Sequence, residues 1–282
     1  MSGDATSAAP RRVETPQAEG SRVERFEAAG RRDRRDPPAE RIAAAIFDTD
    51  GVVTRTATVH AAAWKDLFDA YLRKRAATTG AAFVEFSDED YLLHVDGKAR
   101  ADGVASFLAS RGIELPAGRP DDPPGTETVW GLGNAKNEVF AGVVRENGVE
   151  PFQTTLALVR SLRRHGIRTA VVSASENCAD VLDAAGASGG VEVRVDGRDA
   201  AALGLAGKPD PALFLEAAHR LDVAPRDAAV VEDALAGVEA GRRGGFGLVV
   251  GVDRSGRPDE LLRHGADVVV TDLAQLEVEA DG

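Results

Sequence analysis

The second half of the chain alternates short apolar runs with amphipathic stretches. The apolar runs, rich in Val and Ala, predict strands over 168–173, 191–195, 228–231, 246–250 and 267–270. Between them, apolar residues at helical spacing predict helices over 154–165, 179–185, 211–221, 234–243 and 259–264. Strands that are apolar along their whole length are buried on both faces, so this order predicts a parallel sheet covered by helices on both faces.

The first half contains one such strand, predicted over 42–47, followed by a long helical block. A helix is predicted over 58–79, where five apolar side chains share one face as a core stripe: Trp64, Leu67, Phe68, Tyr71 and Leu72. Further helices over 101–111 and 135–147 flank a loop over 115–133 that is rich in Pro and Gly. Because no strand is indicated between residues 58 and 144, we expect a small helical domain inserted into the α/β domain.

The first forty residues differ in composition from the rest. They are rich in Ala, Gly, Pro, Ser, Arg and Glu and almost lack large apolar residues, so burial cannot offset the entropy of ordering them. A basic run over 31–35 could contact an acidic partner, but a solvated run is the simpler interpretation. We therefore expect a disordered tail over 1–40, an α/β core over 41–57 and 145–282, and a helical domain over 58–144.

The overall charge limits the possible partners. The 282 residues carry a formal net charge of -12, which argues against nucleic acid or an anionic membrane as a partner. Any phosphate must then be bound through metal cations or local basic pockets. The single cysteine, Cys178, excludes an intrachain disulfide and favours a cytoplasmic location. Neither a membrane-spanning apolar run nor a signal peptide is indicated.

Two aspartates follow the first predicted strand, where the chain enters a Gly turn. Asp48 and Asp50 lie in the sequence Phe-Asp-Thr-Asp-Gly at 47–51. Successive strand residues point to opposite faces, so a spacing of two places both carboxylates on one side. One carboxylate could attack a phosphoryl group while the other shuttles a proton. The alternative is a solvated acidic turn.

Polar side chains also follow other predicted strands. The strand over 168–173 runs into Ser-Ala-Ser-Glu-Asn at 173–177, the strand over 228–231 runs into Glu232 and Asp233, and Lys208 lies in a loop before a helix. Each has an ordinary explanation as a helix cap, a turn or a surface loop. Ligands of open parallel sheets bind beyond the carboxyl ends of the strands, so the joint placement favours one shared site.

In their order and spacing these residues resemble the motifs of the haloacid dehalogenase superfamily. Asp48-Thr49-Asp50-Gly51 matches the first motif, Ser173 the second, Lys208 the third and Glu232-Asp233 the fourth. The resemblance covers about residues 43–272, and a helical insertion directly after the first motif is typical of the β-phosphoglucomutase-like group. It implies a Rossmann-like α/β core with helices on both faces of a parallel sheet, plus an inserted helical cap.

The resemblance also implies a phosphoryl-transfer mechanism. Asp48 would become an aspartyl phosphate, while Asp50 would exchange a proton with the sugar oxygen. Ser173 would hydrogen-bond the transferring phosphate and Lys208 would neutralise its charge. Crowded carboxylates suit a hard cation, so Mg²⁺ is the implied cofactor. Its ligands would be Asp48, the backbone carbonyl of Asp50, Glu232 and Asp233, directly or through water.

Substrate-binding residues follow from the same resemblance. The segment over 95–104 resembles a substrate loop, in which Arg100 would hold the phosphate remote from Asp48. Lys136 and Asn137 would face the sugar. Thr56 and His60 would lie at the hinge between core and cap, although packing at a helix start is an equal alternative for His60. The remaining implied substrate-binding residues are Gly97, Ala174, Ser175 and Asn177.

A mutase must hold both ends of a bisphosphate, so Arg100 and Lys136 favour a mutase over a phosphatase. The expected reaction converts β-glucose 1-phosphate to glucose 6-phosphate through the 1,6-bisphosphate. A sugar-phosphate phosphatase is the alternative, and the complete motif set argues against a non-catalytic sugar-phosphate-binding protein. We expect a monomer that acts on a small sugar phosphate.

Four features depart from the group's pattern. Arg55 stands where many relatives carry Asp, and Thr49 where Leu is usual, but neither side chain is assigned chemistry. Glu176 occupies a position where some members carry a Lys that faces the phosphates, which leaves fine substrate preference open. The loop over 115–133 exceeds the group's minimum length and could alter how the cap closes.

Overall fold

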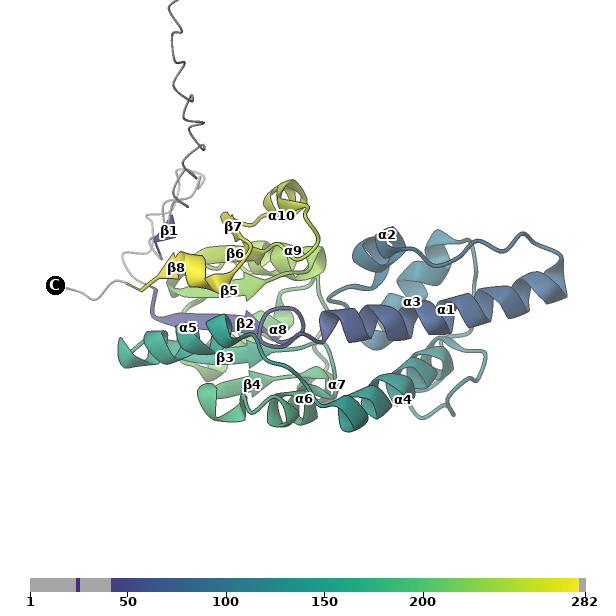
Figure 1. Cartoon of the computed structure of the whole chain (residues 1–282), viewed down its shortest axis with the longest axis horizontal. Coiled ribbons are helices and arrows are strands. Elements are labelled where there is room, and N and C mark those ends of the chain that lie inside the picture. Colours follow the sequence, from purple (N-terminus) through teal and green to yellow (C-terminus); the bar gives the residue numbers. More distant parts are fainter. Residues whose placement is uncertain (1–23, 26–41, 279–282) are drawn as a thin grey trace, which may run out of the picture.

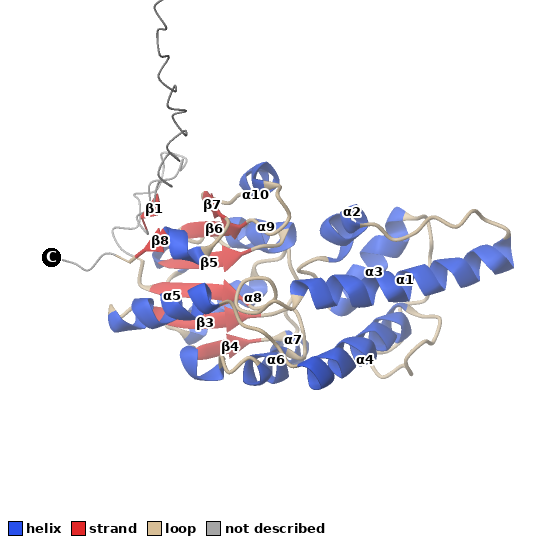
Figure 2. Ribbon diagram, viewed as in Figure 1, coloured by secondary structure: helices blue, strands red, loops and turns tan. Residues whose placement is uncertain are grey.

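A six-stranded parallel sheet forms the centre of the molecule (Figure 2). In the computed structural model, which describes residues 24–25 and 42–278, the strand order is β4-β3-β2-β5-β6-β7. The predicted α/β class and the all-parallel sheet are confirmed. The strands are β2 (Ala44–Asp48), β3 (Arg168–Val172), β4 (Val193–Val195), β5 (Ala228–Glu232), β6 (Leu248–Val252) and β7 (Val268–Val270).

Side chains of β2 alternate between two hydrophobic cores. Ala45 and Phe47 belong to the core shared with α5 (Gln153–Arg164) and α6 (Cys178–Ala184). Ala44 and Ile46 belong to the core on the opposite face, shared with α8 (Ala212–Arg220), α9 (Leu235–Arg243) and α10 (Pro258–His264). Helices therefore cover both faces, as the uninterrupted apolar strands predict.

A second unit lies beyond the carboxyl ends of the strands (Figure 1). Its aromatic side chains pack around Phe68, whose ring centroid lies 4.2 Å from that of Phe107 and 5.0 Å from that of Phe86. We call residues 57–147 the cap. Its elements are α1 (Ala57–Thr79), α2 (Asp88–Asp90), a π-helical turn (Tyr91–Val95), α3 (Arg100–Ser110) and α4 (Val129–Asn147).

Helix α4 is longer than the sequence predicts. It begins at Val129, inside the segment expected to be a loop, because the Thr128 hydroxyl accepts a hydrogen bond from the Gly131 N–H at 2.9 Å and caps the helix. Gly131 and Gly133 obscured this start, since glycine is unfavourable inside helices. Both are needed for space: a Cβ on Gly131 would lie 2.4 Å from the Thr126 carbonyl oxygen.

Smaller elements also differ from the prediction. Strand β6 begins two residues later than expected, because Phe246 packs edge-to-face on Phe214 before the sheet starts. Helix α7 (Gly197–Leu203) was not predicted, and Asp196 forms a capping box at its start. Three short 3₁₀ turns complete the core at Ser188–Gly190, Pro225–Asp227 and Leu273–Gln275.

Cap and core meet through close backbone contacts. A Cβ atom built on Gly97, in the cap, would lie 2.8 Å from the Cβ of Ala234, and one on Gly207 would lie 2.9 Å from Asp102 Oδ2. Real Cβ atoms do not approach other atoms so closely, so glycine permits this fit. The site therefore lies between two units that are already in contact.

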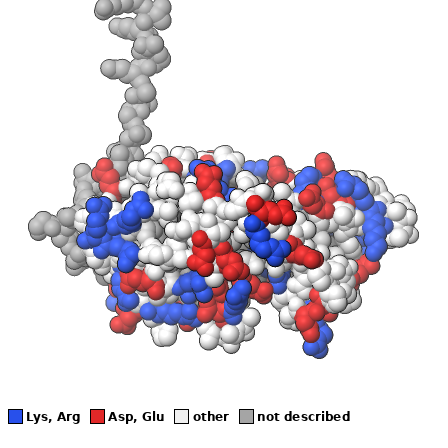
Figure 3. Space-filling view, turned by 60° about the horizontal axis from the view of Figure 1, so that its bottom comes forward, with Lys and Arg blue, Asp and Glu red and all other residues white. Residues whose placement is uncertain are grey.

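The two ends of the described chain lie together. Strand β1 (Glu24–Arg25) pairs in parallel with β8 (Leu276–Glu277), and the rest of the tail predicted over 1–40 lies outside the described residues. On the face shown in Figure 3, basic and acidic side chains are interspersed. Within the described part of the chain, no helix combines the length and apolar character needed to cross a bilayer.

Candidate active site

Asp48 lies at the end of β2 in a buried cluster of charges. The Lys208 ammonium donates to Asp48 Oδ1 at 2.5 Å and to Glu232 Oε1 at 2.7 Å, and the Lys208 side chain is fully buried. Strands β2 and β5 are neighbours in the sheet, so their register brings Asp48 and Glu232 together. Lys208 reaches them from the loop between α7 and α8.

Burial governs how this cluster ionises. Desolvation raises the pKa of Asp48, and although the Lys208 ammonium opposes this, the Glu232 and Asp50 carboxylates reinforce it. Burial alone would lower the pKa of Lys208, but its two carboxylate partners raise it. Lys208 is therefore a permanent positive charge beside Asp48.

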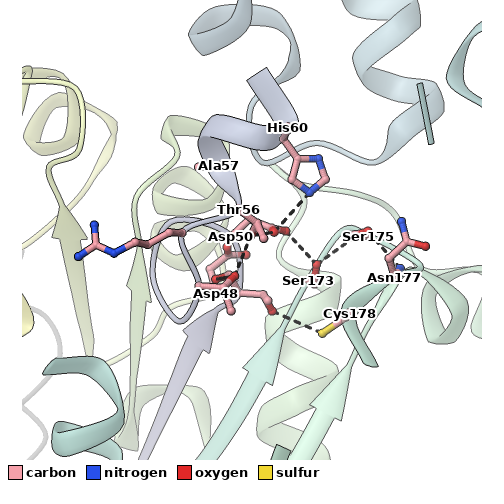
Figure 4. A network of polar contacts seen from close by, with 12 residues as sticks. Asp48, Asp50, Thr56, Ala57, His60, Ser173, Ser175, Asn177 and Cys178 are labelled. Carbon is pink, nitrogen blue, oxygen red and sulfur yellow. Dashed lines mark hydrogen bonds and ion pairs between the residues drawn. The ribbon is translucent and has the colours of Figure 1, made fainter. Parts of the chain in front are cut away.

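Asp50 points into the same site from the turn after β2 (Figure 4). Its carboxylate accepts a hydrogen bond from the Thr56 hydroxyl and lies 3.3 Å from His60 Nε2 and 3.5 Å from the Ser173 hydroxyl. Desolvation would raise the pKa of Asp50, but His60 and Thr56 together lower it to about 2. Asp50 is therefore an anion held by three side chains.

Three carboxylates at strand ends could hold a divalent cation. One oxygen from each of Asp48, Glu232 and Asp233 lies within 4.8 Å of the others. Desolvation and the neighbouring carboxylates raise the pKa of Asp233, and a cation among these groups would relieve that repulsion. Gly51 leaves room for Asp233, because a Cβ there would lie 1.8 Å from Asp233 Oδ2. An all-oxygen donor set of this kind fits Mg²⁺.

Glu232 is engaged on both oxygens. Its Oε1 accepts from Lys208, and its Oε2 accepts from the backbone N–H groups of Asp233 at 2.6 Å and Ala234 at 2.9 Å. The fit is tight, because a Cβ on Gly237 would lie 1.6 Å from Glu232 Oε1. These contacts favour a role in orienting the site, or in binding a cation through water, over direct ligation.

The loop after β3 is stabilised by its own side chains (Figure 4). The Ser175 N–H donates to Ser173 Oγ and the Asn177 N–H donates to Ser175 Oγ, each at 3.1 Å. The Asn177 side chain donates to Asn137 Oδ1 across the cap boundary at 2.7 Å. Ala174 and Ser175 line the cavity described below, whereas Asn177 connects the core to the cap.

Thr49 and Cys178 fill the space beneath the two aspartates. The Thr49 hydroxyl donates to the Val172 carbonyl oxygen at 3.1 Å and lies 3.4 Å from Cys178 Sγ. Burial raises the pKa of the Cys178 thiol to about 12. The thiol therefore stays protonated and acts as a small packing group.

A cavity of about 500 Å³ opens beside Asp48 and Asp50, between core and cap. Three aromatic side chains of the cap contribute to its wall: Trp64, Tyr91 and Trp130. Thr56 and Ser173 are buried next to Asp50. The predicted substrate-binding residues that line the cavity are His60, Gly97, Arg100, Lys136, Asn137, Ala174 and Ser175.

Lys136 is buried in the cap among aromatic rings. Its ammonium lies 2.5 Å from His60 Nδ1 and 4.6 Å from the centroid of the Phe140 ring. Burial lowers the pKa of Lys136 to about 7, although the Asp50 carboxylate acts in the opposite direction. His60 also stacks on Phe140, with centroids 3.9 Å apart, so the packing and hinge interpretations of this residue are compatible.

Arg100 reaches the cavity from the first residue of α3. Its guanidinium donates to Glu176 Oε2 at 3.1 Å, so the side chain expected to hold a remote phosphate is paired with an acid of the core.

Two residues that received no role from the sequence also lie at the site. Arg254 follows β6, donates to the Gly51 carbonyl oxygen at 2.8 Å and lies 3.9 Å above the Phe152 ring, which fixes the turn that carries Asp50. Its position shortly after a strand is the feature of the sequence that could have identified it. In the cap loop, desolvation raises the pKa of Asp96 to about 7, and the Glu232 carboxylate reinforces the effect. No sequence pattern distinguishes Asp96 from other cap acids.

The arrangement suits phosphoryl transfer. One cavity brings together the carboxylates of Asp48 and Asp50, which differ in pKa, and the fixed ammonium of Lys208. Carboxylate oxygens that could hold a cation lie beside them. Transfer of a phosphoryl group requires chiefly this combination of positioning and charge.

Known proteins share this architecture. The family model described as haloacid dehalogenase-like hydrolase matches residues 42–245. A β-phosphoglucomutase from Mycobacterium bovis is 51% identical over 241 residues, covering 84% of this chain and 92% of the relative. A β-phosphoglucomutase from Bacillus subtilis is 30% identical over 237 residues, with coverages of 84% and 92%.

A solved structure agrees with these sequence matches. The β-phosphoglucomutase of Clostridium difficile has a TM-score of 0.63 and 26% identity, covering 84% of this chain and 93% of that one. The parallel sheet, the inserted helices and the sequence matches lead to one conclusion: the chain belongs to the haloacid dehalogenase superfamily, within its β-phosphoglucomutase-like group.

Proposed function

We propose that this chain is a Mg²⁺-dependent β-phosphoglucomutase that converts β-glucose 1-phosphate to glucose 6-phosphate through the 1,6-bisphosphate. The observation that carries the proposal is that one cavity contains Asp48 and Asp50 at one side and Arg100 at another. A bisphosphate needs binding groups for both of its ends. The 51% identity to a protein named β-phosphoglucomutase supports the same activity.

The reaction would proceed in two transfers. With Asp48 phosphorylated, the C6 hydroxyl oxygen of β-glucose 1-phosphate attacks the phosphorus, the bond to Asp48 breaks, and Asp50 takes the hydroxyl proton. The bisphosphate then turns end for end. Asp48 attacks the C1 phosphorus, the bond to the sugar oxygen breaks, and Asp50 returns its proton to that oxygen. Glucose 6-phosphate leaves and Asp48 is phosphorylated again.

Lys208 and Asp50 have the properties that these steps require. Lys208 keeps its charge and can neutralise oxygens as negative charge develops on the phosphate. The pKa of Asp50 is about 2 beside His60, so the group is ionised and free of the proton that it has to accept. A phosphate dianion next to Asp50 would raise its pKa, which lets the carboxyl hold the proton that it later donates.

The acidic cluster would hold Mg²⁺. We propose that Asp48, the Asp50 backbone carbonyl and Asp233 bind the ion, with Glu232 acting through water because both of its oxygens already accept hydrogen bonds. When bound, the ion would neutralise phosphate oxygens and reduce the repulsion among the carboxylates. We further propose that the enzyme acts in the cytoplasm as a monomer.

A product assay tests the proposal. Purified protein, β-glucose 1-phosphate, Mg²⁺ and a trace of glucose 1,6-bisphosphate should yield glucose 6-phosphate with little free phosphate, and chelation of the metal should stop the reaction. Stoichiometric release of free phosphate would reject the mutase.

A sugar-phosphate phosphatase is the second candidate. The observation that favours it is the Arg100–Glu176 ion pair, which neutralises the group expected to hold the remote phosphate. In the same assay this candidate predicts free phosphate and glucose in equal amounts, so one experiment separates the two.

A further inference from the structure

The Arg100–Glu176 pair joins the cap to the core at the edge of the cavity. Arg100 begins α3 in the cap, while Glu176 lies in the loop after β3, and the guanidinium and carboxylate are 3.1 Å apart. The Arg100 side chain is 17% exposed and that of Glu176 is 41% exposed. Glu176 is therefore the partner that can turn into solvent.

The position of Arg100 is fixed from the cap side. A Cβ atom on Gly133 would lie 2.8 Å from Arg100 Cγ, so α4 carries glycine where the arginine stem crosses it. The guanidinium lies 5.8 Å from the Trp130 ring centroid. Its buried Nε has no hydrogen-bond partner among the described residues. Arg100 is thus held in place while one of its donors remains available for a further acceptor.

The pair also separates two spaces. Beyond the inner cavity lies an outer, more open hollow of about 410 Å³, and both are lined by Arg100, Pro120, Asn137 and Glu176. The outer hollow carries additional acids: Asp121, Asp122 and Glu138. The Glu176 carboxylate at this boundary is paired with Arg100, and an anion that binds the guanidinium more strongly has to displace it.

We propose that Glu176 is an internal competitor for Arg100 and thereby determines specificity. Its carboxylate pairs with the Arg100 guanidinium, which would otherwise bind the anionic group at the end of the substrate remote from Asp48. The second phosphate of a bisphosphate must displace this carboxylate. The inference rests on the proposed function in one respect, namely that the cavity takes a sugar phosphate. Glu176 then lowers the affinity for ligands with two phosphates and leaves ligands with one phosphate at Asp48 unaffected.

The effect of removing the charge follows from two unequal contributions. A partly exposed ion pair contributes little to stability, so its loss costs little. The displaced carboxylate, in contrast, stays close to a phosphate dianion and repels it through a partly buried region. Removing the Glu176 charge should therefore tighten the binding of a bisphosphate by about tenfold.

Calorimetric titration tests the competition. An Asp48→Asn background prevents phosphoryl transfer, and in it Glu176→Gln is compared with the parent for glucose 1,6-bisphosphate and for inorganic phosphate, both with Mg²⁺. We expect Glu176→Gln to tighten only the bisphosphate, by about tenfold, and to leave phosphate within about twofold. Glu138→Gln, the same charge change at an exposed residue of the outer hollow, should alter neither. Equal tightening of both ligands by Glu176→Gln, or no tightening, overturns the inference.

A second measurement does not depend on the sugar. The chain has two tryptophans, and Trp64 is buried, so acrylamide quenching without ligand reports mainly on Trp130 beside Arg100. We expect Glu176→Gln, but not Glu138→Gln, to increase quenching, because Arg100 loses its partner in the core. If the bisphosphate binds none of the variants, the proposed function fails. In that case, quenching still tests whether the Arg100–Glu176 pair holds Arg100 in place. Equal quenching in Glu176→Gln and Glu138→Gln would overturn that role of the pair.

Discussion

The core half and the cap half of the site hold their charged groups in different ways. In the core, Lys208 is fully buried between Asp48 and Glu232, and neighbouring strands fix both carboxylates. In the cap, Arg100 meets Glu176 across a boundary that solvent reaches, and the pKa of Lys136 lies at about 7. The groups proposed for bond breaking are therefore held in place by buried ion pairs and neighbouring strands, whereas those proposed for recognition can change partner or charge.

This difference has a geometric origin. Parallel strands present their carboxyl ends at one edge, so side chains from β2, β3 and β5 meet there without any movement of the chain. The cap side chains come from helices that join the core at either end of residues 57–147. Such groups reach the site only while cap and core are in contact, which suits the selection of substrate.

Loss of the proposed nucleophile should have the largest effect. Asp48→Asn keeps the shape of the side chain but removes the carboxylate, so we expect turnover to fall by at least about 10⁴-fold. Circular dichroism should show an unchanged fold. Substantial residual mutase activity would show that Asp48 is not the nucleophile. It would contradict the assignment of bond breaking to the core half of the site.

Lys208→Met should damage both activity and stability. It leaves Asp48 and Glu232 buried without their cation, so we expect the free energy of unfolding to fall by about 3 kcal/mol. Turnover should fall by about 10²- to 10³-fold, measured with glucose 6-phosphate formation. Lys65→Met removes a half-exposed lysine from ion pairs with the buried Asp69 and the exposed Glu85. It should change stability far less, because Asp69 keeps its contacts with Arg73 and the Phe86 N–H. Equal losses of stability in Lys208→Met and Lys65→Met would mean that burial of the lysine does not determine how much its ion pairs contribute.

Gly51→Ala separates backbone strain from crowding at the cation site. Gly51 has a positive φ of 86° and a Cβ there would overlap Asp233, whereas Gly80 has a φ of 73° and nothing within 4 Å. Both alanine variants should lose about 1 kcal/mol of stability through the left-handed backbone. Only Gly51→Ala should weaken the activation by Mg²⁺, by about 10²-fold in activity at low Mg²⁺. A similar Mg²⁺ dependence in the two alanine variants would show that Asp233 is not part of the cation site.

Lys136 should make the stability of the cap depend on pH. Because burial lowers its pKa to about 7 from the ordinary 10.5, the unfolded chain binds more protons than the folded one between these values. The contribution of Lys136 to the free energy of unfolding therefore rises with pH across this window. Relative to Lys136→Met, the wild type should gain roughly 3 kcal/mol between pH 6 and pH 9 in chemical unfolding. A constant difference between the two proteins would place the pKa outside this range.

The smallest effect is expected at the boundary itself. Asn137→Ala removes the hydrogen bond that Asn177 donates across it, so we expect KM to rise about threefold with kcat little changed. Asn177→Ala should behave alike, and the double variant should add nothing further, because the two residues act through one bond. Additive effects on KM would show that each side chain contacts the substrate separately.

The sequence predicts the core better than the cap, and the reason is periodicity. Uninterrupted apolar strands, together with the rule that ligands bind beyond strand ends, point to Asp48, Ser173 and Glu232. Helix α4 was predicted too short, because its glycines serve close contacts that no local pattern reveals. Helical periodicity locates a helix, but it does not identify the residues of other segments that pack against that helix.

Pairing between cap and core was the part that the sequence could not supply. Glu176 was identified as a departure, but its partner Arg100 is 76 positions away and was assigned to a phosphate. The hydrogen bonds that occupy both oxygens of Glu232 likewise depend on the turn of the following backbone. Such contacts arise from tertiary geometry, and a single sequence contains no signal for them.

Cys178 has a practical consequence for studying the cap. It is the only cysteine, it is buried against Thr49, and its pKa is raised to about 12, so thiol-directed dyes would leave it unmodified. Exposed positions on the two units, such as Thr79→Cys on α1 and Arg164→Cys on α5, could then be labelled selectively in the natural background. Energy transfer between two such dyes would measure opening of the cap in single molecules, without first removing a native thiol.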